Sequence, residues 1–361
     1  MLGIDERALK IVWTVFLFGL LLAIVYFIRD TILVFALAVV FAYMLWPVVG
    51  LIERLIPKRR NLALALVYVS LIGILVLIGF ELIPKIADQA TNLATKLPSL
   101  LSKNRLATIP LPSWLDPVRA EIIAFATRQV STLGSRVVPF IQGAGGRILS
   151  GLGALLYVVL IPILAFFFLK DSEQIRVNLI GAVDEGHDQS LVERILDEIH
   201  LVLKNYIRAL VLLAISSFIC WVVFLSVMGY SYDLLLAGLA GVLEFIPVIG
   251  PTAAGLVILT VLGISGSGGL LWIIIFWGCY RLFADYVLSP YLMSSGVELH
   301  PLLVLFGVFA GERLAGVPGM FFSIPAIAIL RVLYVNLKKT YSQTRLTSVD
   351  LRSSTREQTL T

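Results

Sequence analysis

The chain has 361 residues, of which 59% are hydrophobic and 14% charged, and its mean hydropathy is +0.97. Soluble domains carry more polar surface, so this composition excludes a soluble enzyme, a disordered chain and a disulfide-rich secreted module. It favours an all-α polytopic integral membrane protein, with the lipid bilayer as its first partner. The net charge of +5 is typical of basic loops beside a membrane. The sequence lacks a basic module with interleaved aromatic residues, so we expect no nucleic-acid partner.

The first part of the chain, residues 1–83, predicts three membrane-spanning helices. Apolar runs cover Ile11–Ile28, Thr31–Val49 and Leu62–Ile83, and each is close to the ~20 residues that cross a bilayer. Only two residues separate the first two runs, so these helices are expected to form a tight hairpin if both span. The first run has no small-residue cleavage site, and we expect it to be a helix rather than a cleaved signal.

Residues 84–150 are mixed in polarity and predict an extramembrane segment. Apolar residues recur at three- and four-residue spacing on both sides of the proline-broken turn Ile109–Trp114, which predicts two amphipathic helices. A solvated hairpin that packs on itself fits this pattern. A membrane-surface or subunit-contact element fits it equally well, and this second interpretation predicts a homo-oligomer.

The remaining chain predicts five further spans, which makes about eight in all. Residues 151–169 hold the fourth span, and residues 170–205 predict a cytoplasmic amphipathic segment opened by an N-cap pattern at Asp171. Residues 206–337 hold the last four runs, and residues 338–361 form a polar tail that is predicted to be disordered. The four runs are Tyr206–Met228, Leu234–Gly263, Leu270–Ser289 and Leu299–Asn336.

The distribution of Lys and Arg predicts the orientation of these spans. With eight spans and a cytoplasmic N-terminus, the basic residues of the short loops collect on the cytoplasmic side. Arg29 is the exception on the opposite short loops. We therefore expect both termini in the cytoplasm of a bacterial inner membrane, with residues 84–150 on the other face.

The stretch Glu244–Pro251 interrupts an apolar run at membrane depth. Pro247, Gly250 and Pro251 lie within five residues, and a regular helix does not continue through such a sequence. Broken backbone in a bilayer persists where protein covers it or where it lines a watery cavity. A plain proline kink or an interfacial loop is the simpler alternative. Because Glu244 stands beside the break, we favour a re-entrant or discontinuous helix of the kind that forms transport sites.

Charged pairs occur in the last two apolar runs. Arg281 and Asp285 are four residues apart, so they share one helix face and can pair. Glu312 and Arg313 lie in the glycine-rich stretch Gly311–Gly319. A structural ion pair and a polar transport pathway both explain charges at such positions, and the residues alone do not separate these interpretations. The candidate pathway residues are Glu244, Pro247, Gly250, Pro251, Arg281, Asp285, Glu312 and Arg313.

Glycines and prolines predict helix breaks in the same region. Gly307 and Gly311 are spaced for close helix approach, and the glycines after Gly311 suggest two half-helices joined by a break. A surface turn between two short spans is the alternative. The candidate break residues are Pro290, Pro301, Gly316, Gly319 and Pro325.

No pattern predicts catalysis, a cofactor or a metal site. His187 and His200 are expected to be solvated, and His300 to begin a helix. No pair of histidines or cysteines has metal-ligand spacing. The glycine clusters lack the Gly-Lys-Ser/Thr ending of a phosphate-binding loop, and no Ser/His/Asp order suggests a hydrolase. We therefore expect a protein that is not an enzyme.

Four motifs in the last third resemble those of the autoinducer-2 exporter family of bacterial membrane transporters, and the resemblance extends roughly from Lys10 to Asn336. One departure is Ala209-Leu210, where the family often has Gly-Gln. The motifs are Phe245–Pro251, Asp285–Pro290, Val297–Leu302, and Gly316–Met320 followed by Ile324-Pro325.

The resemblance implies a multi-pass protein of the cytoplasmic membrane with eight spans. Some members are assigned export of autoinducer-2, and others sodium or lithium/proton antiport. We therefore expect a secondary transporter or permease for a small polar solute, with autoinducer-2 as a candidate. Antiport of a monovalent cation is the first alternative, and a membrane scaffold or regulator without transport is the second.

Overall fold

The computed structural model describes residues 6–57, 59–100, 121, 152–183, 187–265, 269–292 and 299–358. Within these ranges the regular structure is helical and contains no strand. Six of the helices are long and apolar enough to cross a membrane, and shorter apolar helices accompany them. The prediction of an all-α polytopic membrane protein is therefore confirmed.

The N-terminal helices follow the predicted spans but run beyond them. Helix α1 lies almost wholly exposed, as expected of a helix that faces lipid or another subunit. Helix α3 is continuous through Pro84, so the first part of the expected extramembrane segment prolongs the third span. Most of the remaining segment, up to residue 150, lies outside the described residues. The bounds are α1 (Glu6–Phe27), α2 (Arg29–Leu55), α3 (Arg60–Leu100) and α6 (Leu152–Lys170).

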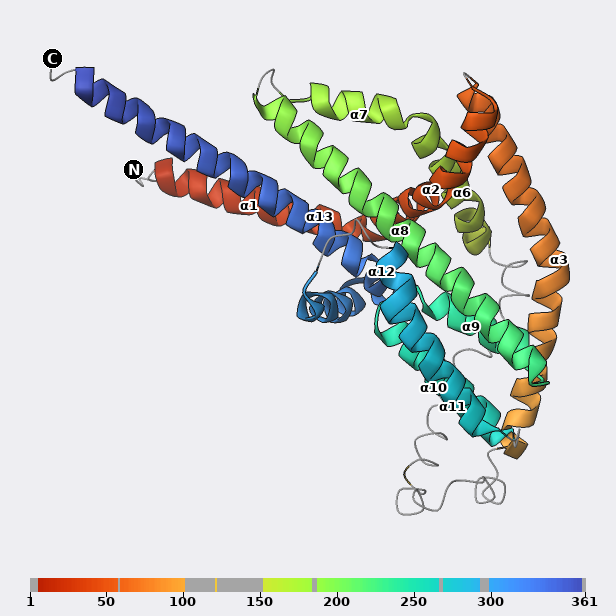
Figure 1. Ribbon diagram of the computed structural model, residues 1–361. Helices are drawn as coiled ribbons and strands as arrows, with labels where there is room; N and C mark the ends of the chain where they lie inside the picture. The colour runs from red at the N-terminus through yellow and green to blue at the C-terminus, as the bar shows by residue number, and fades with distance from the viewer. Residues whose placement is uncertain are drawn as a thin grey trace.

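Helix α8 (His187–Val227) is the central element of the fold. Its 41 residues extend about 60 Å, which is roughly twice the hydrocarbon thickness. Its polar first part therefore projects from the apolar body, and helix α7 (Ser172–Gly181) packs against it there. Figure 1 shows α8 in green across the centre of the molecule, with α2, α3 and α6 on one side. On its other side lie α9 (Asp233–Leu243), α10 (Ile249–Ile264) and α11 (Leu270–Phe283).

The break at Glu244–Pro251 folds as a helical hairpin. Helix α9 (Asp233–Leu243) and helix α10 (Ile249–Ile264) contact each other and are joined by a short turn. They have 11 and 16 residues, or about 17 and 24 Å, so each is shorter than the ~30 Å hydrocarbon core. The expected single run Leu234–Gly263 is thus two short helices that reverse direction. Val248 turns the chain with a φ of +66°.

The main apolar core joins this hairpin to its neighbours. Trp221 and Leu225 of α8 pack with residues of α9, α10 and α11, among them Leu236, Ile258 and Ile273. A second core cluster joins α2, α3 and α6. The hairpin is therefore packed against α8 and α11 by buried side chains rather than exposed to lipid on all sides.

The third interrupted run contains a widened turn. Helix α11 (Leu270–Phe283) continues into the π-helical turn η2 (Ala284–Leu288) and the short helix α12 (Ser289–Leu292). Pro290 lies directly after the π turn. A proline has no N–H to donate and crowds the preceding turn, and a wider turn accommodates both effects.

The last run forms a second reversal. Helix α13 (Pro301–Gln358) has non-helical dihedrals at Ala315 and Gly316, and Gly316 has a φ of +63°. Gly311 lies against Gly319, and Gly307 lies against Ile327, so the two arms run back along each other. Pro301 begins the helix, where its missing N–H costs little. Pro325 lies within the second arm, away from these non-helical dihedrals.

The polar tail after Lys338 is continuous with α13, and its disorder stays a prediction. The backbone is helical through Gln358, although the composition after Lys338 is typical of disordered segments. Residues 338–358 contain no glycine or proline, so nothing in the local sequence stops the helix that begins in the apolar part of α13.

Gly319→Ala is expected to weaken the second reversal. A Cβ at this position would overlap the carbonyl of Gly311 in the facing arm, and we expect a loss of ~1–3 kcal/mol. Gly278→Ala is the matched control, because no atom lies within 4 Å of its added Cβ. Thermal unfolding in detergent measures both variants, and equal melting temperatures would contradict the close contact.

Candidate functional site

Arg281 of α11 joins two carboxylates from different parts of the fold. Its Nη1 lies 3.3 Å from Oε1 of Glu244 at the tip of the first hairpin. Its Nε donates to Oδ2 of Asp285 at 2.8 Å, and its Nη2 donates to Oδ1 of the same residue. The guanidinium therefore binds one acid bidentately and reaches a second acid across the helix interface. We call Glu244, Arg281 and Asp285 the charged triad.

The backbone explains why these three groups meet. Glu244 is the C-cap of α9, directly after Leu243, where the helix ends and the chain turns into α10. Arg281 and Asp285 are four residues apart, on one face of α11 and its π turn. The Glu244 side chain is 5% exposed, against 31% for Arg281 and 44% for Asp285. Glu244 thus depends most on its partner, because a buried charge without one is costly.

A small cavity borders the triad. Its volume is about 10 Å³, which is about the space of a single water molecule. Tyr280, whose hydroxyl is buried, is one of the residues that line this cavity. The space beside Glu244 and Arg281 is therefore nearly filled, whereas Asp285 does not border this cavity. The lining residues are Ser217, Trp221, Glu244, Pro251, Ala254, Trp277, Tyr280 and Arg281.

The proline and glycine candidates shape the hairpin rather than supply charge. Pro247 lies in the turn, and Pro251 lines the small cavity. Gly250 lies against the carbonyl of Leu243, so the two arms of the hairpin touch at this residue. These positions bring Glu244 to Arg281 and hold it there.

Glu312 and Arg313 stand apart from the triad. They pair with each other at 3.6 Å, and their side chains are 53% and 90% exposed. Both precede the reversal at Ala315 and Gly316, on the first arm of α13. The structure therefore does not bring them to the triad, and of the charged candidates only Glu244, Arg281 and Asp285 form one cluster.

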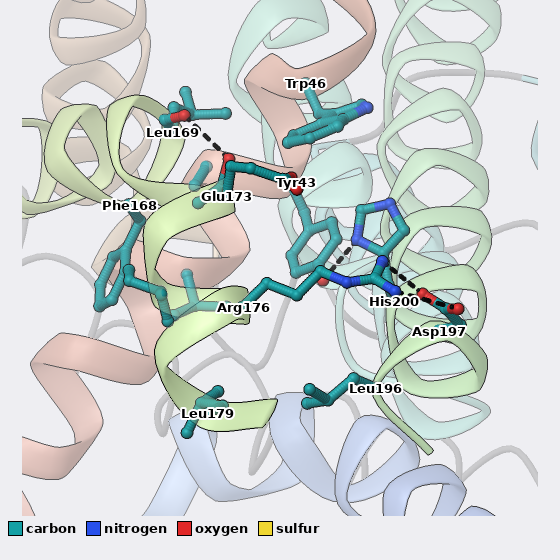
Figure 2. A pocket seen from close by; sticks show the side chains of 14 residues that line it. Tyr43, Trp46, Phe168, Leu169, Glu173, Arg176, Leu179, Leu196, Asp197 and His200 are labelled. Atoms are coloured by element: carbon teal, nitrogen blue, oxygen red, sulfur yellow. Dashed lines mark hydrogen bonds and ion pairs between the residues drawn. The ribbon is translucent and has the colours of Figure 1, made fainter. Parts of the chain in front are cut away.

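A larger cavity lies where α2, α6, α7 and α8 meet, and the sequence analysis did not identify it. Its volume is about 380 Å³. His200 lines it and is not simply solvated as expected, because its ring packs against Tyr43 and Trp46. Figure 2 shows the rings of Tyr43 and His200 beside the guanidinium of Arg176, which reaches from α7 to Asp197 of α8. The spacing of Tyr43 and Trp46 on one helix face is the signal that could have pointed to the cavity.

The described residues offer no cluster of three or more His, Cys, Asp or Glu side chains that could hold a metal ion.

Comparison with known proteins matches the chain to one family over most of its length. The family model of AI-2E family transporters matches residues 15–339. PerM of Escherichia coli (strain K12), provisionally named a permease, is 31% identical over 327 residues, which cover 86% of this chain and 88% of PerM. YrrI of Bacillus subtilis (strain 168), provisionally named a transport protein, is 22% identical and covers 77% of this chain and 78% of its own length.

Proposed function

Because the chain belongs to the AI-2E family of multi-pass membrane transporters, we propose that it is a secondary transporter whose pathway passes the charged triad. The observation that carries this proposal is the contact of Arg281 with both Glu244 and Asp285 at the tip of the short α9–α10 hairpin. Re-entrant ends and intramembrane charges are the features from which secondary transporters build their sites.

The triad has a chemistry suited to small polar cargo. One guanidinium faces two carboxylates, so the three groups carry one net negative charge when all are ionised. Movement of the hairpin away from α11 would separate Glu244 from Arg281. The exposed carboxylate would then accept a proton or a monovalent cation, or a hydrogen bond from a polar solute, until the contact closes again.

The family supports two kinds of cargo for this mechanism. Export of a small polar solute, with autoinducer-2 as the candidate, is one proposal that is compatible with a family of transporters. Antiport of sodium or lithium against protons is the alternative, and the net negative triad favours it. A scaffold without transport has no use for Glu244, whose carboxylate is buried in an apolar region. The mechanism uses no cofactor and no catalytic residue.

A flux assay in proteoliposomes tests the proposal. Autoinducer-2, sodium and lithium are offered separately, with and without a proton gradient. Solute movement without dissipation of the gradient supports export, and ion-dependent dissipation supports antiport. If none of the three moves through protein that is folded and inserted, the transport proposal fails for all of these cargoes.

We further propose that both termini and residues 170–205 face the cytoplasm of a bacterial inner membrane, because the basic residues of short loops collect on that side. Single cysteines at Ser113 and at Gln174 are expected to react differently with an impermeant thiol reagent added outside intact cells. Ser113, which lies outside the described residues, is expected to be labelled. Labelling of Gln174→Cys but not of Ser113→Cys would contradict this orientation.

A homo-oligomer also remains a proposal. It rests on the apolar stripes of residues 84–150, most of which lie outside the described residues, and on the exposed apolar surface of α1. Ile122→Asp with Leu133→Asp is expected to reduce the mass of the detergent particle. An unchanged mass for folded protein would remove the reason to place the subunit contact there.

A further inference from the structure

We propose that the cavity between α2, α6, α7 and α8 binds an organic ammonium ion with a compact apolar body. This cavity shares no lining residue with the small cavity at the charged triad. The inference is therefore independent of the proposed transport site. Its volume of about 380 Å³ lies within the range of small-molecule sites.

The walls of the cavity are largely apolar, and several of the lining side chains carry rings. Tyr43 and Trp46 come from α2, and Phe168 comes from the end of α6. The His200 ring lies 5.2 Å from the ring of Trp46, and its Nδ1 is 3.1 Å from the Tyr43 hydroxyl as a hydrogen-bond partner. This packing holds the rings in place from two helices. Faces of such rings attract a cation most strongly where water is partly excluded.

The charges at the cavity favour a cation over an anion. Arg176 donates to Asp197 at 2.6 Å and to Glu193 at 3.0 Å, so two carboxylates already neutralise it. The hydrogen bond with Asp197 raises the pKa of this guanidinium above its usual value. An anionic ligand would have to displace those carboxylates from Arg176. The described lining residues offer no second cation to pair with the displaced carboxylates.

Glu173 supplies the unmatched negative charge. Its carboxylate has no hydrogen-bond or ion-pair partner among the residues that the structure describes. Figure 2 shows Glu173 on α7, on the side of the cavity that faces Tyr43 and Trp46 of α2. An ammonium group placed between the rings and this carboxylate would gain both cation–π and charge-pair attraction. A neutral ligand would gain neither.

The ammonium group has two natural sources, a soluble amine and the headgroup of phosphatidylethanolamine. The cavity lies between the apolar spans α2 and α6 and the helices α7 and α8. Both sources present the same chemistry to Trp46 and Glu173. The experiment therefore varies the lipid as well as the soluble probe.

Equilibrium dialysis tests the proposal with the full chain in nanodiscs of phosphatidylglycerol at pH 8, where an ordinary imidazole is neutral. Benzyltrimethylammonium, benzyl alcohol and benzenesulfonate share one aromatic ring and differ in charge. We expect saturable binding of the cation, at least about tenfold weaker binding of the alcohol, and no binding of the anion. Added phosphatidylethanolamine that competes with the probe assigns the site to the headgroup, and no competition assigns it to a soluble amine.

Substitutions of lining residues test whether the probe binds in this cavity. Glu173→Gln is expected to weaken affinity for benzyltrimethylammonium about fivefold, and Trp46→Leu about tenfold. The matched controls are Glu81→Gln on α3 and Trp272→Leu on α11, both exposed and away from the cavity. Glu173 is exposed, so its variant is expected to fold even if Trp46→Leu does not. Equal affinity for the cation and the alcohol, or an unchanged affinity in Glu173→Gln, would overturn the proposal.

Discussion

Gly250→Ala is expected to disrupt the first hairpin and to remove transport. A Cβ on residue 250 would overlap the carbonyl oxygen of Leu243 and crowd Ile246, so the backbone would have to shift at the point where the two arms touch. We expect a loss of ~3 kcal/mol or more in stability, because the clash is with backbone rather than with the end of a side chain. Thermal unfolding in detergent and flux in proteoliposomes measure the two effects.

Gly238→Ala is the control for this variant. It makes the same change in α9, where no atom lies within 4 Å of the added Cβ, and alanine is favoured over glycine in a helix by up to ~1 kcal/mol. It is therefore expected to keep wild-type flux with equal or higher stability. If Gly250→Ala matches Gly238→Ala in both measurements, the close contact at the hairpin tip is wrong.

Arg281→Gln is expected to be the most damaging change in the charged triad. It leaves Glu244 buried without its cation, and breaking a buried ion pair by removing one partner costs ~3–5 kcal/mol. Glu244→Gln is expected to cost much less, because Arg281 keeps its bidentate partner Asp285. Melting temperatures in detergent are expected to fall in the order wild type, Glu244→Gln, Arg281→Gln.

A double variant separates this explanation from a simple loss of packing. Arg281→Gln combined with Glu244→Gln removes the buried charge together with its partner. It is expected to be more stable than Arg281→Gln alone, although it carries one more substitution. If the stability losses of the two single variants simply add, the contact between Glu244 and Arg281 contributes nothing to stability.

The spans and the pair on α11 could be predicted from the sequence, because both depend on local spacing. Apolar runs give the lengths of helices, and a four-residue separation places Arg281 and Asp285 on one face. The cluster of Pro247, Gly250 and Pro251 likewise predicts a break. What it could not give is the direction of the chain after the break, which depends on how α9 and α10 pack.

The contact between Glu244 and Arg281 could not be predicted, because it joins residues 37 apart on separately packed helices. This contact changes how a double variant of Arg281 and Asp285 is interpreted. Arg281→Gln with Asp285→Asn looks like removal of a complete pair when the sequence alone is considered. In the structure it leaves Glu244 without its cation, so that variant no longer separates a structural pair from a transport site. The cavity at His200 was missed for the same reason, since it needs four helices to meet.

Flux through Glu244→Gln in proteoliposomes tests the central claim most directly. This variant keeps the shape of the side chain and removes its titration, and Glu312→Gln on the exposed pair is the control. The proposed pathway predicts that Glu244→Gln lowers flux of the transported cargo at least about tenfold, an activation cost of ~1.4 kcal/mol, at near wild-type melting temperature, while Glu312→Gln transports normally. Wild-type flux through inserted Glu244→Gln protein would contradict a pathway past the triad.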